Sequence, residues 1–113
     1  MKNYHISLFR HGRTNANERG QYIGTTDFPL NDRGRSELYD KTDKYVYPKV
    51  QRVYTSPLQR CTESAEILFP DREIVVAEEF RELHFGRFEG KTAEELMENA
   101  EYLTWIRCRT WDQ

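Results

Sequence analysis

A histidine between an arginine and a glycine, directly after an apolar stretch, is the part of this sequence that points most clearly to chemistry. The segment Arg10-His11-Gly12-Arg13-Thr14 follows residues 4–9. An arginine grips phosphate oxygens through its planar fork of donors. A glycine lets a bulky anion approach the backbone, and a neutral imidazole can attack phosphorus. The alternative is a strand followed by a charged loop with an incidental histidine, and these five residues alone do not decide between the two.

Strands and loops must hold this segment in place. Apolar and β-branched residues predict strands over 4–9, 50–55 and 73–77. Long loops rich in charge and glycine follow the first and third strands, over 10–30 and 78–91, and loops of this length are usually functional. Strands alternating with helical segments indicate an α/β fold with a parallel sheet.

Three helices are predicted from their N-terminal signals. The first begins near Asn31 or Asp32, and the second at Ser56-Pro57, with the serine as the cap and the proline in the first helical position. The third begins at Thr92, which forms a capping box with Glu95. The apolar residues expected to face the core are Leu38, Tyr45 and Val46 in the first helix, Leu58, Cys61 or Thr62, Ala65 and Leu68 or Phe69 in the second, and Leu96, Met97, Ala100, Leu103 and Ile106 in the third.

Side chains able to handle phosphate follow all three predicted strands. Arg10 and His11 follow the first strand, Arg60 lies shortly after the second, and Glu82 lies shortly after the third. Ligands of parallel α/β sheets bind at the carboxyl ends of the strands. We therefore expect a nucleophile, two guanidiniums and a carboxyl group near one another, which favours the phosphate-handling interpretation over the incidental histidine.

Four sequence blocks resemble those of the histidine phosphatase superfamily, also called phosphoglycerate mutase-like. The blocks are Arg10-His11-Gly12-x-Thr14-x-x-Asn17, Tyr22-x-Gly24-x-x-Asp27-x-Pro29-Leu30, Tyr54-Thr55-Ser56-Pro57-x-x-Arg60-x-x-x-Ser64-Ala65 and Arg81-Glu82-Leu83-x-Phe85-Gly86-x-Phe88-Glu89-Gly90. They occur in the family's order and extend over most of the chain. The resemblance implies a three-layer α/β fold with a mainly parallel sheet.

The resemblance also implies a mechanism through a phosphohistidine. His11 corresponds to the nucleophile, and Arg10 and Arg60 to the clamp on the phosphoryl oxygens, where charge gathers in the transition state. Glu82 corresponds to the general acid that protonates the leaving oxygen and later activates water. Asn17 corresponds to a further phosphate-binding residue. Neither a metal nor a cofactor is implied, because the guanidiniums supply the positive charge.

Each of these residues also has a structural interpretation. Without the family pattern, Arg60 reads as a solvated charge in the first turn of a helix. Glu82 shares its loop with Glu78, Glu79 and Glu89, so that only the Glu-Leu-x-Phe-Gly context singles it out. Three other polar residues are expected not to be catalytic, namely His5, His84 and the helix cap Ser56.

The family pattern is incomplete in this sequence. The family places a second active-site histidine on a later strand, in a Ser-His-Gly-like segment, whereas no histidine follows His84 here. The resemblance therefore implies that residues 1–113 are a single, C-terminally truncated domain without the later strands. It corresponds to the N-terminal half to two-thirds of the family domain. We expect turnover by this chain to be impaired.

A missing strand has consequences for association as well. In the family the strand that bears the second histidine lies inside the sheet, beside the first strand. Without it, interior strands expose backbone edges and apolar faces. We therefore expect a fragment, a truncated gene product, or a chain that self-associates to cover its incomplete sheet.

Composition limits the partners and the compartment. The 113 residues carry 17 basic and 19 acidic side chains, for a net charge of −2, which is too balanced to indicate a nucleic-acid or membrane-surface partner. No apolar run is long enough for a membrane span, and no secretory leader opens the chain, so we expect a cytoplasmic protein. The three histidines and the carboxylates show no metal-ligand spacing, and we predict no metal.

The function expected is hydrolysis of a phosphomonoester on a small phosphorylated metabolite. Within the family the rival is a phosphoglycerate mutase. Ile23 precedes Gly24 where the mutase pattern usually has a small hydroxyl or thiol residue, and the turn at 27–30 is more similar to small phosphatases such as those acting on α-ribazole phosphate. The alternative from another class is a catalytically silent module that binds phosphate or a partner.

Overall fold

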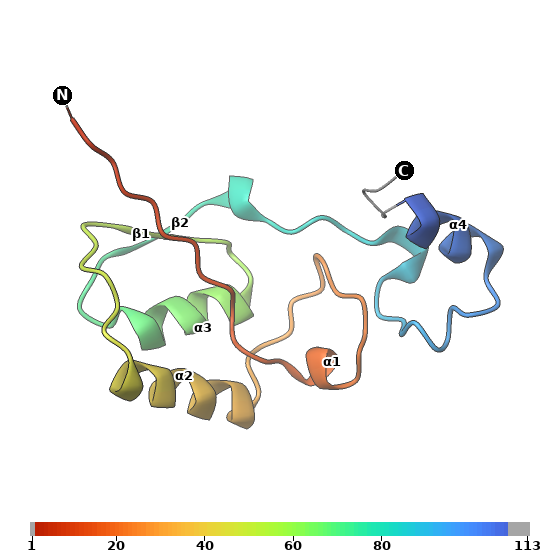
Figure 1. The fold of residues 1–113 in the computed structure, drawn as a ribbon, viewed down its shortest axis with the longest axis horizontal. Coiled ribbons are helices and arrows are strands. Elements are labelled where there is room, and N and C mark those ends of the chain that lie inside the picture. The colour runs from red at the N-terminus through yellow and green to blue at the C-terminus, as the bar shows by residue number, and fades with distance from the viewer. Residues whose placement is uncertain (1, 109–113) are drawn as a thin grey trace.

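A computed structural model describes residues 2–108 of the chain (Figure 1). In chain order the helices and strands are α1 (Asn15–Glu18), α2 (Asp32–Lys44), β1 (Val53–Thr55), α3 (Gln59–Leu68), β2 (Ile74–Val76) and α4 (Ala100–Cys108). Two short 3-10 turns, η1 (Glu78–Phe80) and η2 (Gly86–Phe88), lie between β2 and α4.

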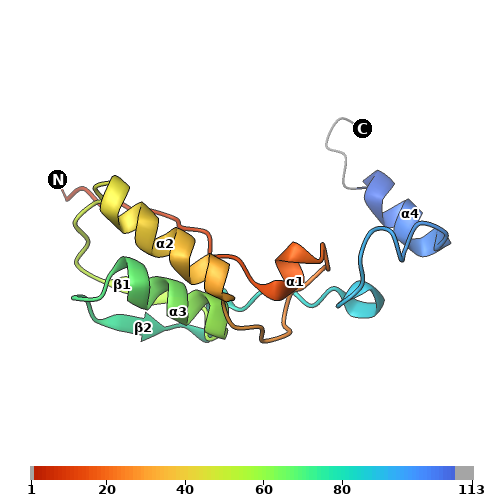
Figure 2. The same cartoon turned by 90° about the horizontal axis from the view of Figure 1, so that it is seen from below.

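The sheet of the described residues is small and parallel. β1 pairs with β2, with Val53 opposite Ile74 and Thr55 opposite Val76. The connecting helix α3 contacts both strands and also α2, so that α3 lies between α2 and β2 in the view of Figure 2. The expected α/β class with a parallel sheet is confirmed, and both strands are shorter than the predicted 50–55 and 73–77.

The predicted strand over 4–9 is wrong as a paired strand. Residues 2–10 have no strand assignment and are all exposed; Ile6 and Leu8 are 86% and 93% exposed. A strand is defined by the ladder it shares with a neighbour, and no described strand pairs with this segment. Its described side-chain packing is at its end, where the Phe9 ring lies 5.5 Å from the rings of Tyr47 and Phe69.

Helix α2 begins where the sequence predicts. The Asn31 side chain accepts a hydrogen bond from the Gly34 N–H at 2.7 Å, as an N-cap residue does. Leu38 is buried as expected, whereas Tyr45 and Val46 are exposed. The helix ends at Lys44, so Tyr45 and Val46 lie outside it and the inward positions predicted for them are wrong.

Helix α3 begins two residues later than predicted and is capped from a distance. Ser56 and Pro57 precede the helix, whose N-cap residue Leu58 has no side chain able to cap it. Asp27 supplies the missing acceptor, since its Oδ1 takes the backbone N–H of Gln59 at 2.7 Å. Ser56 instead accepts from the Leu58 N–H at 3.4 Å, in the turn before the helix. The predicted inward positions of α3 are confirmed at Leu58 and Ala65, which are buried.

The core beside α2 and α3 depends on two close backbone approaches. A Cβ on Gly34 would lie 2.2 Å from the backbone oxygen of Arg13, so α2 passes directly against the segment that follows His11. A Cβ on Gly12 would lie 2.9 Å from Leu38 Cδ1 and 3.1 Å from Leu30 Cδ2. The expectation that Gly12 makes room for an anion is therefore wrong in this structure, since the missing Cβ leaves room for the two leucines.

Gly34→Ala is expected to lower the free energy of unfolding by about 2 kcal/mol or more, although alanine has the better helix propensity by about 1 kcal/mol. The clash is with backbone, which a rotamer change cannot relieve. Urea unfolding measures the effect, with Ser36→Ala on the exposed face of the same helix as the control. Equal stability of Gly34→Ala and the parent chain would contradict the close approach.

The segment before α4 differs from its prediction. The Thr92–Glu95 capping box forms, with the Glu95 N–H donating to Thr92 Oγ1 at 3.1 Å, but it closes a turn. The helix starts at Ala100, where Asn99 accepts the Tyr102 N–H at 2.9 Å. The predicted apolar stripe is confirmed at Leu96, which is buried, and is wrong at four exposed residues, Met97, Ala100, Leu103 and Ile106.

Helix α4 is held by an aromatic cluster at the opposite end of the molecule from α2 (Figures 1 and 2). The cluster consists of Tyr22, Phe85, Phe88, Tyr102 and Trp105, with ring centroids 5.4–6.0 Å apart. Tyr102 is fully buried, and its hydroxyl shares a hydrogen bond of 2.6 Å with that of Tyr22. The cluster fixes the loop around 85–88 against the loop around Tyr22.

Candidate active site

His11 is half-buried, and its ring orientation is set by the backbone. Its Nδ1 lies 2.6 Å from the carbonyl oxygen of Gly12. Because a carbonyl only accepts, Nδ1 carries the proton, and in the neutral ring the lone pair is then on Nε2. Nε2 is therefore the nitrogen available for attack.

The surroundings of His11 favour its neutral form. Burial lowers the pKa of His11 below its usual 6.5, and the positive charges of Arg60 and Arg10 act in the same direction, against the hydrogen bond to Gly12 and the charge of Glu82. An imidazole with a lowered pKa is unprotonated and nucleophilic at neutral pH. The charges that act on the pKa of His11 thus include those of Arg10, Arg60 and Glu82, the three residues predicted to surround it.

Arg60 is an anchored, buried side chain in this structure. It is 3% exposed, and its two terminal nitrogens donate to the carbonyl oxygens of Thr26 at 2.8 Å and Gly24 at 2.5 Å. The interpretation of Arg60 as a solvated surface charge is therefore wrong. A guanidinium has five N–H donors, so three remain for an anion beside His11.

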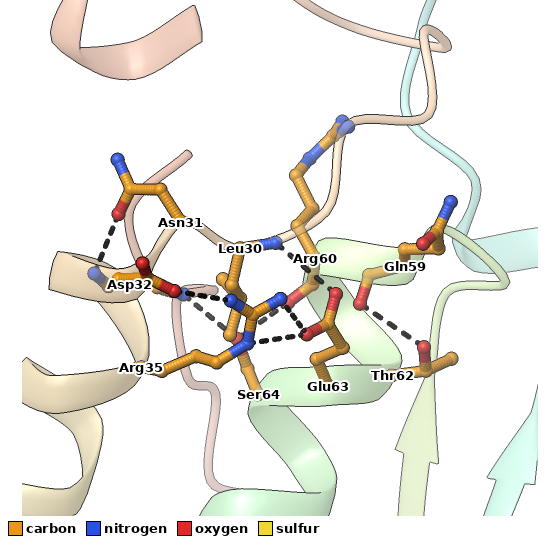
Figure 3. Close-up of polar contacts among 11 residues, drawn as sticks. Leu30, Asn31, Asp32, Arg35, Gln59, Arg60, Thr62, Glu63 and Ser64 are labelled. Carbon is orange, nitrogen blue, oxygen red and sulfur yellow. Dashed lines mark hydrogen bonds and ion pairs between the residues drawn. The ribbon is translucent and has the colours of Figure 1, made fainter. Parts of the chain in front are cut away.

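Ser64 joins the histidine segment to α3. Its hydroxyl donates to the carbonyl oxygen of Arg60 at 2.6 Å (Figure 3). The same hydroxyl accepts the N–H of Gly12 at 2.9 Å. The backbone directly after His11 is thereby bound to Ser64, which lies one helical turn after Arg60 in α3. The sequence analysis assigned no role to Ser64, although the residue lies in one of the family blocks.

Asn17 takes part in the cap of α1. It is exposed, and its Oδ1 accepts the Thr14 N–H at 2.9 Å while the Asn17 N–H donates to Thr14 Oγ1 at 3.1 Å. The pair forms the capping box of α1. The side-chain nitrogen of Asn17 is the group left to donate to a phosphate, and its role there stays a prediction.

Glu63 connects the loop before α2 to α3 (Figure 3). Its carboxylate accepts the Leu30 N–H at 3.3 Å and two hydrogen bonds from Arg35, at 3.1 Å from Nε and 2.8 Å from the terminal nitrogen. This ion pair joins two helices that are adjacent in space. No local pattern in the sequence pointed to it.

Glu89 is another residue near the site whose role no pattern in the sequence indicated. Its carboxylate accepts hydrogen bonds from the N–H groups of Gly24, Thr26 and Phe85 and from the Thr26 hydroxyl. Burial acts to raise the pKa of Glu89, but these hydrogen bonds outweigh it and lower the pKa to about 2. The group is thus ionised at neutral pH and joins two loops.

The low pKa of Glu89 predicts a pH-dependent contribution to stability. A carboxyl group whose pKa falls from 4.5 to about 2 on folding stabilises the fold above pH 4.5 and loses that contribution as pH falls through 2. Allowing for solvent screening, the contribution is about 2 kcal/mol at neutral pH. We expect the difference in unfolding free energy between the parent chain and Glu89→Gln to fall by more than half between pH 6 and pH 3. A difference independent of pH in urea unfolding would contradict this.

Comparison with known proteins decides the family. The family model of the histidine phosphatase superfamily (branch 1) matches residues 6–113. The chain belongs to the histidine phosphatase superfamily.

Curated relatives of this histidine phosphatase chain are longer than it is. A Bacillus subtilis (strain 168) protein described as the uncharacterized phosphatase PhoE is 36% identical over 93 residues, covering 80% of this chain and 48% of its own. The adenosylcobalamin/alpha-ribazole phosphatase of Escherichia coli (strain K12) is 33% identical over 108 residues, covering 92% and 52%. The chain thus spans about half the length of these relatives.

Solved structures of histidine phosphatases share its fold. Phosphoserine phosphatase from Entamoeba histolytica, in complex with 3-phosphoglyceric acid, superposes with a TM-score of 0.77 at 29% identity, over 88% of this chain and 50% of that one. The alpha-ribazole phosphatase of Shigella flexneri gives a TM-score of 0.72 at 26% identity, over 91% and 52%. The expected phosphoglycerate mutase-like fold is therefore confirmed for this part of the domain.

The described part of this histidine phosphatase chain shows neither a metal-binding cluster nor a membrane-spanning helix. Residues 2–108 hold no group of three or more His, Cys, Asp or Glu side chains arranged to bind a metal ion. No helix within the same range has the length and apolar character that crossing a membrane requires.

Proposed function

We propose that this chain carries the phosphoryl-accepting part of a phosphomonoesterase that works through a phosphohistidine at His11. The observation that supports this most is the half-buried His11, with Nδ1 held by the Gly12 carbonyl and a lowered pKa, within electrostatic reach of Arg10, Arg60 and Glu82. A neutral nucleophile beside two cations and a carboxyl group is the set that transfer of a phosphoryl group requires.

The reaction proceeds in two displacements. In the first, the Nε2 lone pair forms an N–P bond, the ester P–O bond breaks, and protonated Glu82 gives its proton to the leaving oxygen. In the second, the Glu82 carboxylate takes a proton from water, the water oxygen attacks phosphorus, and the N–P bond breaks to release phosphate and neutral His11. Arg10 and Arg60 stabilise the charge on the non-bridging oxygens in both steps, and Asn17 adds a donor.

The substrate class proposed is a small phosphorylated metabolite. Relatives of this chain are named as phosphatases of adenosylcobalamin and α-ribazole and of phosphoserine, and phosphoserine is a phosphomonoester of a small metabolite. Ile23, before Gly24, favours a phosphatase over the phosphoglycerate mutase that is the rival within the family. Mutase turnover without net release of phosphate would reverse that preference.

Trapping the intermediate tests the mechanism. The chain is incubated with a 32P-labelled phosphomonoester, quenched in alkali and digested. We expect label on the peptide that contains His11, stable in alkali and lost in acid, as a phosphoramidate is. Label on a serine peptide, or none with any phosphomonoester, would refute the phosphohistidine route.

The second candidate is a module that binds phosphate without turnover. Arg10 is exposed without a described partner, and Arg60 retains unused donors, so an oxyanion can bind through charge-assisted hydrogen bonds. In that case inorganic phosphate raises the melting temperature by mass action while no phosphohistidine forms. The trapping experiment and a melting curve together separate the two functions.

Self-association and a cytoplasmic location stay predictions. The observation that supports association is the exposed segment 2–10, whose Tyr4, Ile6 and Leu8 side chains are 82%, 86% and 93% exposed. Such apolar surface favours pairing with a second copy. Light scattering that gives a compact monomer of 13.6 kDa would contradict it.

A further inference from the structure

We propose that Glu89 is a positioning residue that fixes the general acid Glu82 relative to His11 and Arg60. It does so by holding together two loops, residues 22–27 and residues 81–85. The inference rests on the proposed function only in that His11 and Glu82 are the groups whose relative placement matters.

The first loop is held by four hydrogen bonds to the Glu89 carboxylate. The Gly24 N–H lies 3.0 Å from Oε1 and 3.1 Å from Oε2. Oε2 also accepts the Thr26 N–H at 3.0 Å and the Thr26 hydroxyl at 2.6 Å. A carboxylate offers about four acceptor sites, and this loop alone uses most of them.

The second loop is held by the same carboxylate and by backbone contact. The Phe85 N–H donates to Oε1 of Glu89 at 3.0 Å. A Cβ on Gly24 would lie 1.6 Å from the backbone oxygen of Leu83, so the two loops touch directly beside Glu82. The placement of Glu82 therefore depends on where Gly24 is held.

The first loop is also the anchor of Arg60. Gly24 and Thr26 donate their N–H groups to Glu89, and their carbonyl oxygens accept the two hydrogen bonds from Arg60. Polar groups connected in this way polarise and fix one another. One carboxylate thus connects the loop that anchors the Arg60 guanidinium to the loop that carries Glu82.

Other carboxylates near Glu82 lack these contacts. Glu78 forms an ion pair with Arg81 at 3.0 Å, and Glu79 is exposed with no described partner. Glu89→Gln keeps the size of the side chain, but its NH2 group faces N–H donors and cannot accept from them. Glu79→Gln removes the same charge from the same region and is the matched control.

The test measures how strongly Glu82 influences His11. The His11 ring is titrated by NMR, its signal assigned by its loss in His11→Asn, in the parent chain and in Glu82→Gln. Because the Glu82 charge raises the pKa of His11, Glu82→Gln lowers it. The measurement is then repeated with Glu89→Gln added to the parent chain and to the Glu82→Gln chain, which gives the effect of Glu82→Gln on the pKa of His11 in both backgrounds. We expect the shift in the His11 pKa caused by Glu82→Gln to fall to less than half of its parent value in the Glu89→Gln background. In the Glu79→Gln background we expect the full shift.

If Glu82→Gln shifts the His11 pKa by the same amount in the Glu89→Gln background as in the parent chain, the proposal is overturned. If Glu89→Gln does not fold, Thr26→Val decides, because it removes only the 2.6 Å hydroxyl bond; we expect a smaller but measurable loss of the Glu82 effect, and an unchanged effect refutes the role. The readout needs no turnover. If no phosphohistidine forms but the effect of Glu82 on the His11 pKa still depends on Glu89, the proposed function is contradicted and the positioning role stands.

Discussion

His11→Ala is expected to abolish formation of the phosphoenzyme and to lower release of phosphate from an aryl phosphate by about 10³-fold or more. Alanine has no lone pair to form the N–P bond, and the other two histidines are not held as His11 is. His5 lies in the exposed N-terminal segment, and the Nδ1 of His84 is occupied by the Gly86 N–H at 2.8 Å. Neither can replace the nucleophile.

Phosphate release and acid-labile label measure this effect side by side. His5→Ala is the matched control, since it removes an exposed imidazole that has no described partner and is expected to leave both signals unchanged. A melting curve shows whether His11→Ala remains folded. Folded His11→Ala that still takes up acid-labile label at the parent rate would show that another residue is phosphorylated.

Arg60→Lys is expected to weaken both the fold and the binding of anions. A single ammonium cannot reach the carbonyl oxygens of Gly24 and Thr26 together and also present a fork to phosphate. The buried carbonyl that loses its partner costs about 1–3 kcal/mol of unfolding free energy. Loss of the guanidinium weakens binding of inorganic phosphate by about 10-fold or more, because charge-assisted bidentate bonds are the strong ones.

Urea unfolding and calorimetric titration with phosphate separate these two effects. Arg72→Lys makes the same arginine-to-lysine exchange at an exposed position just after α3. We expect it to change neither the free energy of unfolding nor the affinity for phosphate. Lower stability with unchanged phosphate affinity would leave Arg60 as an anchor only and contradict its role as a clamp.

Local signals in the sequence predicted the elements around α2 and α3 well. Asn31 caps α2 through its own side chain, and the spacing of Leu58 and Ala65 placed the inner face of α3. These features depend on residues three or four positions apart, which a sequence displays directly. The strand over 4–9 failed because pairing requires a partner that local alternation does not reveal.

The candidate site was predictable where several motifs converged. His11, Arg60 and Glu82 follow three predicted strands, and the charges of Arg60 and Glu82 both act on the pKa of His11. Glu89 could not be separated from three other glutamates in its region, because its partners at Gly24 and Thr26 lie more than 60 positions away. A contact of that kind leaves no periodic or local pattern in the chain.

The cap that Asp27 provides for α3 makes the start of this helix conditional on a distant loop. Its acceptor reaches Gln59 from 32 positions earlier, so the first turn of α3 is completed only after that loop has closed. Arg60 stands in this first turn, and its two carbonyl partners lie on the same loop. Loop opening and helix fraying are then one cooperative event in the native state. The backbone amide of Gln59 is then expected to exchange with solvent in proportion to the fraction of time that the loop is open, so that its protection from exchange reports how much of the time the anion clamp is assembled.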